Sequence, residues 1–313
     1  MFRVFYIANR VDNIIHADHD KHYNFKNRRF ILEPATGLTI LGGAIGSSKI
    51  IEKLLGPTAD YLGGEIKGYT EKGLNNLGRV FRHASNTLGE RIEEPGQVPP
   101  KVLKGILDEG YFSEDQLSAQ YFGGVLASSR TGIQRDDRGT SFIKLIGRLS
   151  TYQIRTHFIF YTILKSICGI RHDNLGILTE RQKFKIWIPF PLYSTAMDFR
   201  PGENPNVLLQ HIMNGLTREE LIDGSWNMGS TEHIKKNENL KVDSSGIVFR
   251  SSAVGLELYL WAHGESSVAV SDFLSADFSP MPLDDMVIPE GAKSYAPDIV
   301  NEEGCNKKVQ PTS

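Results

Sequence analysis

The sequence predicts a mainly α-helical protein, with a multi-helix body and a small α+β winged-helix-like C-terminal domain. Apolar residues recur at steps of three and four between Gly37 and Ile92, which is the spacing of one helix face. Further along the chain, Ser or Thr is repeatedly followed three residues later by Glu or Gln, the pattern of a helix-capping box. A short apolar run at residues 246–250 predicts a strand that leads into another helix.

The helical pattern of residues 37–92 contains one expected break. Gly56 precedes Pro57, and proline removes a helical hydrogen bond but suits the first turn of a new helix. Residues 94–100 contain three prolines, which end the pattern and predict an extended linker. Four shorter helices are then expected from the capping-box pairs Ser113/Gln116, Ser150/Gln153, Thr179/Gln182 and Thr217/Glu220.

These patterns divide the chain into four expected regions. Residues 1–36 read as an N-terminal extension, and residues 37–186 as the helical domain. Alternating apolar residues and prolines after Lys185 indicate a boundary or a long connection, followed by the winged-helix-like domain at 187–288. Residues 289–313 have the composition of a disordered tail. The C-terminal domain is expected to contain helices at 207–213 and 216–222, a polar loop at 224–245, a strand at 246–250 and a helix at 253–262.

Charge is nearly balanced overall but unevenly distributed. The net charge is −2, so the chain as a whole is neither strongly basic nor strongly acidic. Between Arg130 and Ile186, however, eleven Lys or Arg stand against four acids, whereas residues 251–292 hold seven acids and no Lys or Arg. Such blocks either pair with each other inside the protein or mark a surface for a charged partner.

The sequence favours a cytoplasmic protein. Its two cysteines, Cys168 and Cys305, do not form a disulfide framework, which fits a reducing compartment. The N-terminus has no secretion signal, and the longest nearly uncharged apolar segment, Thr36 to Ser48, is shorter than the ~18–20 residues that cross a bilayer.

The loop at residues 130–139 is the candidate binding site. It carries five charges in ten residues, and binding residues concentrate on loops that a rigid scaffold positions. Lys144 and Arg148 are four residues apart and therefore lie on one helix face, which extends the basic surface. Asp136 and Asp137 form a weaker candidate polar site, since paired acids suit Mg²⁺, although a solvated loop is the simpler interpretation. The candidate anionic-partner residues are Arg130, Arg135, Arg138, Lys144, Arg148 and Arg155.

Other motifs do not point to catalysis, to a metal or to a cofactor. His16, His19 and His22 alternate with acids, but such short consecutive spacing suits a solvated loop better than a metal site. Residues 42–49 are rich in Gly and Ser but lack the Walker spacing of a phosphate-binding loop. The sequence contains no nucleophile elbow and no paired Cys-x-x-Cys, so it predicts no catalytic residue, no metal site and no cofactor.

Four blocks of sequence resemble the abortive-infection alpha (Abi-alpha) family. They are residues 49–63, 98–103, 117–127 and 142–150, and residues 246–259 resemble the strand and helix that close the family's domain. The resemblance covers about residues 38 to 262. It implies a bacterial, cytoplasmic, mainly helical protein associated with phage defence, and it supplies no catalytic residues.

The leading hypothesis is a non-enzymatic phage-defence protein of the abortive-infection type that binds a protein or an anionic partner. One alternative is a membrane-active effector with peripheral membrane contact, because small residues four apart in the Gly-rich helices of 37–92 support helix contacts in lipid. Another is a nucleic-acid-associated regulator that uses the basic segment 130–186. The C-terminal domain is not expected to recognise DNA, since its candidate recognition helix at 252–262 has no basic residue for phosphate contacts.

Overall fold

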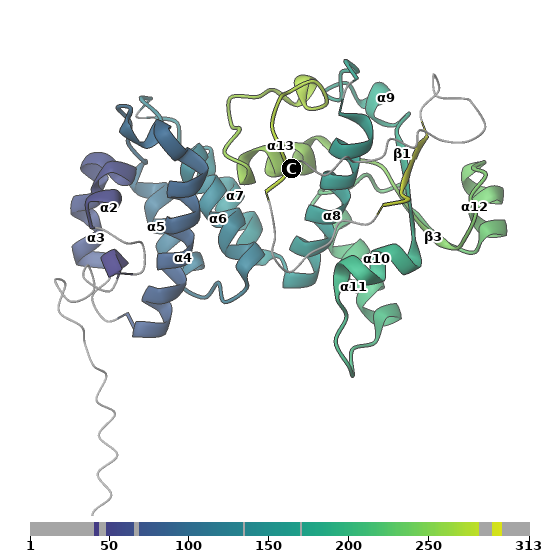
Figure 1. Cartoon of the computed structure of the whole chain (residues 1–313), viewed down its shortest axis with the longest axis horizontal. Helices are drawn as coiled ribbons and strands as arrows, with labels where there is room; N and C mark the ends of the chain where they lie inside the picture. Colours follow the sequence, from purple (N-terminus) through teal and green to yellow (C-terminus); the bar gives the residue numbers. More distant parts are fainter. Residues whose placement is uncertain are drawn as a thin grey trace, which may run out of the picture. The chain divides into compact units, whose positions relative to one another are not determined.

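The structure is a computed structural model of the whole chain, shown in Figure 1. It describes residues 41–43, 48–65, 69–133, 135–169, 171–281 and 290–295. The chain divides into two units, residues 1–30 and 31–313, and every described residue lies in the second. The expected N-terminal extension at residues 1–36, with its histidines at 16–22, therefore lies outside the described residues, as do residues 44–47 of the Gly-rich segment.

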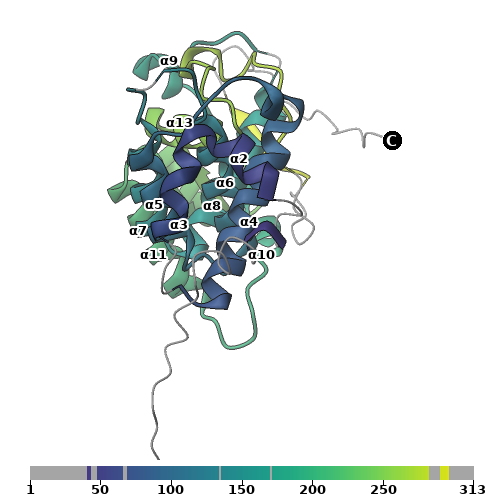
Figure 2. The same cartoon turned by 90° about the vertical axis from the view of Figure 1, so that its left-hand side faces the viewer.

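The described residues are mainly helical, as predicted. The expected break at Gly56 is confirmed: its φ is +59°, and a 3₁₀ turn at Gly56–Thr58 separates two helices. Figure 2, which views the helical region from its N-terminal side, shows α2 and α3 nearest the viewer. The helices that precede the sheet are α2 (Ser48–Leu55), α3 (Ala59–Glu65), α4 (Glu71–Leu88), α5 (Pro100–Gly110), α6 (Gln116–Ser128), α7 (Gly139–Arg148), α8 (Thr151–Cys168) and α9 (Leu178–Arg181).

Two adjacent glycines let α6 lie close to helices on both sides. A Cβ on Gly123 would stand 2.8 Å from the carbonyl oxygen of Val80 in α4. A Cβ on Gly124 would stand 1.7 Å from the carbonyl oxygen of Ala262. These contacts explain why the helical region tolerates glycines that each cost roughly 1 kcal/mol of helix propensity relative to alanine.

Helix α8 is the central element of the described core. It packs against α6, and against four elements that follow it in the chain: α10 (Phe190–Met197), α11 (Pro205–Arg218), α13 (Ala253–Ala262) and β4 (Lys293–Tyr295). Its sequence is apolar on nearly every side, and Phe158, Phe160 and Tyr161 are all fully buried, which is typical of a helix enclosed by its neighbours. The predicted capping box at its start is confirmed, since Ser150 and Gln153 each accept from the other's backbone N–H.

A four-stranded antiparallel sheet in the order β2-β3-β1-β4 follows α9. Ile186 pairs with Phe249 and Ile188 with Ile247 in the central β1–β3 ladder. In Figure 1 this sheet and α12 lie on the opposite side of α8 from α4. The strands are β1 (Lys185–Pro189), β2 (Asn227–Gly229), β3 (Gly246–Phe249) and β4 (Lys293–Tyr295); the helices between and after them are α10 (Phe190–Met197), α11 (Pro205–Arg218), α12 (Thr231–Glu238) and α13 (Ala253–Ala262).

Several expectations for the C-terminal half are wrong in detail. The two helices expected at 207–213 and 216–222 form the single helix α11, because Gly215 stays helical where it packs against the Gln153 side chain. The expected polar loop at 224–245 contains β2 and α12. The expected disordered tail contributes β4, which pairs with β1. The segment after Lys185, interpreted as a boundary or long connection, is the central strand β1.

Three of the four expected capping boxes are not formed. Asp115, rather than Ser113, caps α6 by accepting from the Ser118 N–H. Thr179 lies inside α9. Thr217 lies near the end of α11, where its hydroxyl donates to the Met213 carbonyl. The pattern alone therefore does not distinguish a helix start from a residue within a helix.

Strand β3 and helix α13 occupy almost exactly the expected positions. The hydrophobic core includes buried residues from both sides of the expected boundary, such as Leu164 and Ile188. Within the described part of the chain, no helix combines the length and the apolar character needed to span a bilayer.

Candidate functional site

Arg130, the first residue of the predicted basic loop, is held by backbone carbonyls. Its Nε donates to the carbonyl of Lys53 at 3.2 Å, and its Nη1 donates to the carbonyl of Arg91 at 3.1 Å. Its Nη2 donates to the carbonyls of Ile92 and Glu94. Four of its five N–H groups are thus used to join α6 to the end of α2 and to the turn that follows α4.

The remaining charges of the loop also make internal contacts, with one exception. Arg138 forms a bidentate ion pair with Asp136, at 2.8 and 2.9 Å, and lies over the ring of Trp261. Asp137 accepts from Lys101 of α5 at 2.8 Å. The side chain of Arg135 is exposed and has no hydrogen bond or ion pair among the described residues. The loop is therefore a connected structural element that leaves one cation uncommitted.

Of the three residues predicted to extend the basic surface, two make contacts within the protein and one does not. Arg148 pairs with Glu219, the residue that follows α11, at 2.8 Å, and Arg155 donates to the carbonyl of Ala196 at the end of α10. Lys144 is exposed and makes no such contact within the described ranges. The structure does not bring the six predicted residues into one open patch, and their role in binding an anionic partner stays a prediction.

We expect the Arg130→Ala variant to lower the free energy of unfolding by about 2 kcal/mol, because hydrogen bonds from a charged group to several partly buried carbonyls are lost. Arg135→Ala is the matched control in the same loop and should change stability by less than about 0.5 kcal/mol. Urea denaturation followed by circular dichroism measures both. Equal effects from the two variants would contradict the structural role of Arg130.

The acidic block at 251–292 lies near cations of the basic segment. The ammonium group of Lys165 donates to the carbonyls of Phe273, Leu274 and Ala276. Burial lowers the pKa of Lys165, and the neighbouring Asp277 partly opposes this shift. The pKa of Arg138 is raised chiefly by Asp136, with Glu257 adding to the effect. Part of the basic block is therefore used to hold the acidic one in place.

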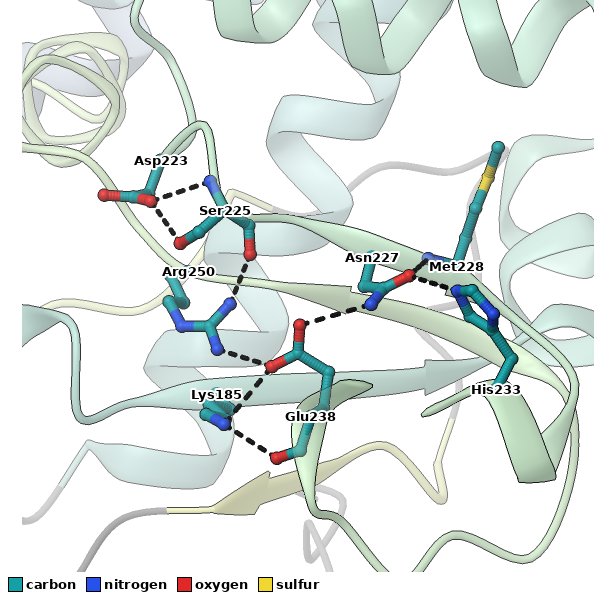
Figure 3. A network of polar contacts seen from close by, with 8 residues as sticks. All are labelled: Lys185, Asp223, Ser225, Asn227, Met228, His233, Glu238 and Arg250. Carbon is teal, nitrogen blue, oxygen red and sulfur yellow. Dashed lines mark hydrogen bonds and ion pairs between the residues drawn. The ribbon is translucent and has the colours of Figure 1, made fainter. Parts of the chain in front are cut away.

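The most connected polar cluster lies where α12 meets the sheet (Figure 3). The Glu238 carboxylate, 8% exposed, accepts from Arg250 at 2.5 Å and lies 3.2 Å from the ammonium of Lys185. Burial raises the pKa of Glu238, but the hydrogen bond and charge of Arg250 and the contact with Lys185 outweigh it, so the pKa is lowered. Arg250 also donates to the carbonyl of Ser225.

His233, at the edge of this cluster, has a hydrogen-bond partner at each ring nitrogen. Asn227 donates its amide to Glu238, so its side-chain oxygen accepts from the His233 Nε2–H at 2.9 Å. The Nδ1 atom of His233 accepts from Asn237 at 3.3 Å. Both ring nitrogens are therefore occupied, and the cluster of Figure 3 has the character of a structural anchor for α12.

Polar side chains converge on an open groove along α4. The groove has a volume of about 620 Å³. Its cations outnumber its carboxylates by three to one, which gives it an anion-attracting character. The lining residues are Glu71, Lys72, Asn75, Asn76, Arg79 and Arg82.

Arg79 is the best-positioned cation of this groove. Its Nη2 donates to the side-chain oxygen of Asn76 at 2.7 Å and to the carbonyl of Ser113 at 3.0 Å. Asn76, 5% exposed, is fixed in turn because its amide donates to the carbonyl of Tyr111. The Nε–H and the two Nη1–H groups of Arg79 have no acceptor in the described part of the chain. Both paired faces of a guanidinium group include Nη2, so these three donors can give single hydrogen bonds, not a bidentate pair, to a carboxylate or a phosphate.

The turn between α5 and α6 contacts the residues of α4 that line the groove. A Cβ on Gly73 of α4 would stand 1.8 Å from the ring of Tyr111, so only glycine lets this ring pack against the helix. Lys72 pairs with Glu114 at 2.5 Å. Phe112 is 76% exposed, and its ring meets Tyr111 edge-on at 4.7 Å between centroids. The turn thus presents an aromatic ring next to the residues that hold Arg79.

The electrostatics of α4 agree with this geometry. The pKa of His83 is lowered, first by burial and then by the charges of Arg82 and Arg79. The neighbouring arginines therefore produce a local field that disfavours a further positive charge.

The sequence analysis did not identify this groove. Lys72, Asn75, Arg79 and Arg82 follow each other at steps of three, four and three, which places them on one helix face. This spacing could have predicted a polar face on the helix. The apolar residues of the same helix were instead interpreted as a face that packs against other helices.

Among the described residues, no group of three or more His, Cys, Asp or Glu is arranged to hold a metal ion. Comparison of the chain with protein-family models, with curated proteins and with solved structures finds no match in any of the three. The resemblance to the Abi-alpha family therefore stays a prediction from the sequence.

Proposed function

We propose that this protein acts by binding an anionic partner in the groove of α4. The observation that carries the proposal is the fixed position of Arg79. Asn76 and the Ser113 carbonyl both accept from Nη2 of its guanidinium group, and its other N–H groups have no acceptor among the described residues. A pre-oriented arginine loses less entropy on binding than a mobile one.

The proposal differs from the sequence hypothesis in its location. The binding surface moves from the loop at 130–139 to α4, because Arg130 and Arg138 are engaged in contacts within the protein. Arg135 and Lys144 remain a second, smaller candidate surface. The winged-helix-like interpretation of residues 187–288 and a cytoplasmic location also stay predictions, and the proposal depends on neither.

Binding of polyphosphate, measured by isothermal titration calorimetry, tests the groove. Arg79→Gln should weaken binding about tenfold or more, because a hydrogen-bonded charge contact contributes roughly 1.5–3 kcal/mol. Arg218→Gln on α11 is the matched control, since Arg218 is 66% exposed and its one ion pair among the described residues is with its neighbour Glu219. If both variants bind polyphosphate as the unchanged protein does, the groove is not the binding site.

The resemblance to the Abi-alpha family supports a role for this binding in phage defence. Regulated expression in bacteria, with and without phage, tests that role. We expect the unchanged protein to limit phage growth, and the Arg79→Gln variant to have lost that protection while the Arg218→Gln variant retains it. Protection that is independent of Arg79 would separate defence from the groove.

A further inference from the structure

We propose that the anionic partner of the α4 groove is single-stranded nucleic acid, with a phosphate at Arg79 and an unpaired base on the ring of Phe112. The inference rests on the proposed function, because it names the partner of the same groove. It adds a second feature, an exposed aromatic ring, that a simple anion would not use.

The cations of the groove follow a line. Lys72 and Arg82 are ten residues apart on α4, which corresponds to about 15 Å along a helix, and Arg79 lies between them on the same face. Lys72 already pairs with Glu114, so Arg79, which has three N–H donors without an acceptor among the described residues, is the best-positioned phosphate contact. A linear arrangement suits a chain of phosphates better than a single compact ion.

Phe112 supplies the feature that selects a base. Its ring is the most exposed of the large apolar side chains described, at 76%. The edge-on contact with Tyr111, at an interplanar angle of 84°, supports the ring without covering it. Tyr111 is itself held by Tyr69, by Gly73 and by the hydrogen bond from Asn76 to its carbonyl. The aromatic ring and the arginine are therefore positioned by the same turn.

Positive grooves flanked by aromatic rings bind single strands because every unpaired base offers a face for stacking. In a duplex the bases are stacked on one another and do not reach such a ring. An acidic peptide would satisfy Arg79 but gains nothing specific from Phe112. The pairing of Arg79 with Phe112 thus favours a single strand over both.

Fluorescence anisotropy of the full chain with labelled oligothymidylate and oligouridylate tests this inference. We expect at least one of the two strands to bind more tightly than a duplex of equal length. Phe112→Leu should weaken that binding about fivefold or more, whereas Phe112→Trp should preserve it, since stacking contributes about 1–3 kcal/mol per base. Arg79→Gln should reduce the slope of log affinity against log salt by about 0.7.

The controls separate this inference from the proposed function. A difference between the two oligonucleotides identifies the preferred nucleotide, since they differ in the sugar and in the methyl group of the base, and Arg218→Gln should leave binding unchanged. If an oligoglutamate peptide binds as well as the strands and Phe112→Leu has no effect, the nucleic-acid inference is wrong while the anion-binding groove stands. If strands, peptide and polyphosphate all fail to bind, both proposals are wrong.

Discussion

Glu238→Gln should lower the free energy of unfolding by about 3–5 kcal/mol, because it leaves Arg250 buried without a counter-charge. The side chains of Arg250 and Glu238 are only 9% and 8% exposed. Their contact joins the last residue of α12 to the residue that follows β3. Urea denaturation at neutral pH measures the change. Glu232→Gln in the first turn of the same helix is the control and should leave the free energy of unfolding nearly unchanged, since Glu232 is exposed.

A second variant separates the charge effect from general damage to α12. When Glu238→Gln is combined with Arg250→Met, the uncompensated charge is removed, and part of the lost stability should return. If the double variant is less stable than the sum of the single effects predicts, the ion pair is not the reason for the loss.

Stability should fall as pH is lowered from 7.5 to 5, by about 2 kcal/mol for each of two buried histidines. Burial lowers the pKa of His157 to about 3 and that of His263 to about 4. In the unfolded chain both have a pKa near 6.5, so below that pH the unfolded state binds protons that the folded state does not. The loss begins near pH 6.5 and levels off below the folded pKa values.

Burial causes the lowered pKa of both histidines, and a hydrogen bond from each ring to a backbone carbonyl partly opposes it. His157 Nε2–H donates to the Gly255 carbonyl, so Nδ1 accepts from the Tyr121 hydroxyl at 2.7 Å. His263 Nδ1–H donates to the Tyr259 carbonyl, and its Nε2 has no partner in the described part of the chain. Protonation would therefore place a buried charge at either ring.

His263→Phe should make the stability difference between pH 7.5 and pH 5 smaller by about 2 kcal/mol. The ring stacks among aromatic side chains, so phenylalanine preserves its packing. His172→Phe is the control, because His172 is exposed. Denaturation curves of the three proteins at both pH values measure the effect. A pH dependence that His263→Phe leaves unaltered would contradict the assignment.

Local signals predicted the helices better than the sheet. Helix α13 begins and ends where the apolar run at 253–262 predicted, and strand β3 was expected from its β-branched residues. Strand β1 was interpreted as a connection because prolines interrupt its alternation. In the structure Pro189 ends the strand, and Pro191 lies in the first turn of α10, where proline is tolerated.

Polar contacts between residues that are far apart in the chain could not be predicted from the sequence. The sequence of α12 is polar around most of its surface, so it gave no apolar face, yet the Ser230 cap and the buried Glu238 stabilise it as a helix. Likewise, a count of charges indicated that the loop at 130–139 is basic. It did not indicate that Arg130 would meet carbonyls that lie 36 to 77 residues away in the chain.

The side-chain Nε–H resonance of Arg79, followed by NMR while polyphosphate is added to the full chain, tests the groove most directly. Arg218 provides an internal reference, because it lies at the end of α11, outside the groove, and its Nε–H donates to the next residue, Glu219. We predict a saturable shift of the Arg79 signal, with the Arg218 signal nearly constant. An Arg79 signal that stays unchanged while calorimetry detects binding would contradict the account, because the anion would then bind elsewhere.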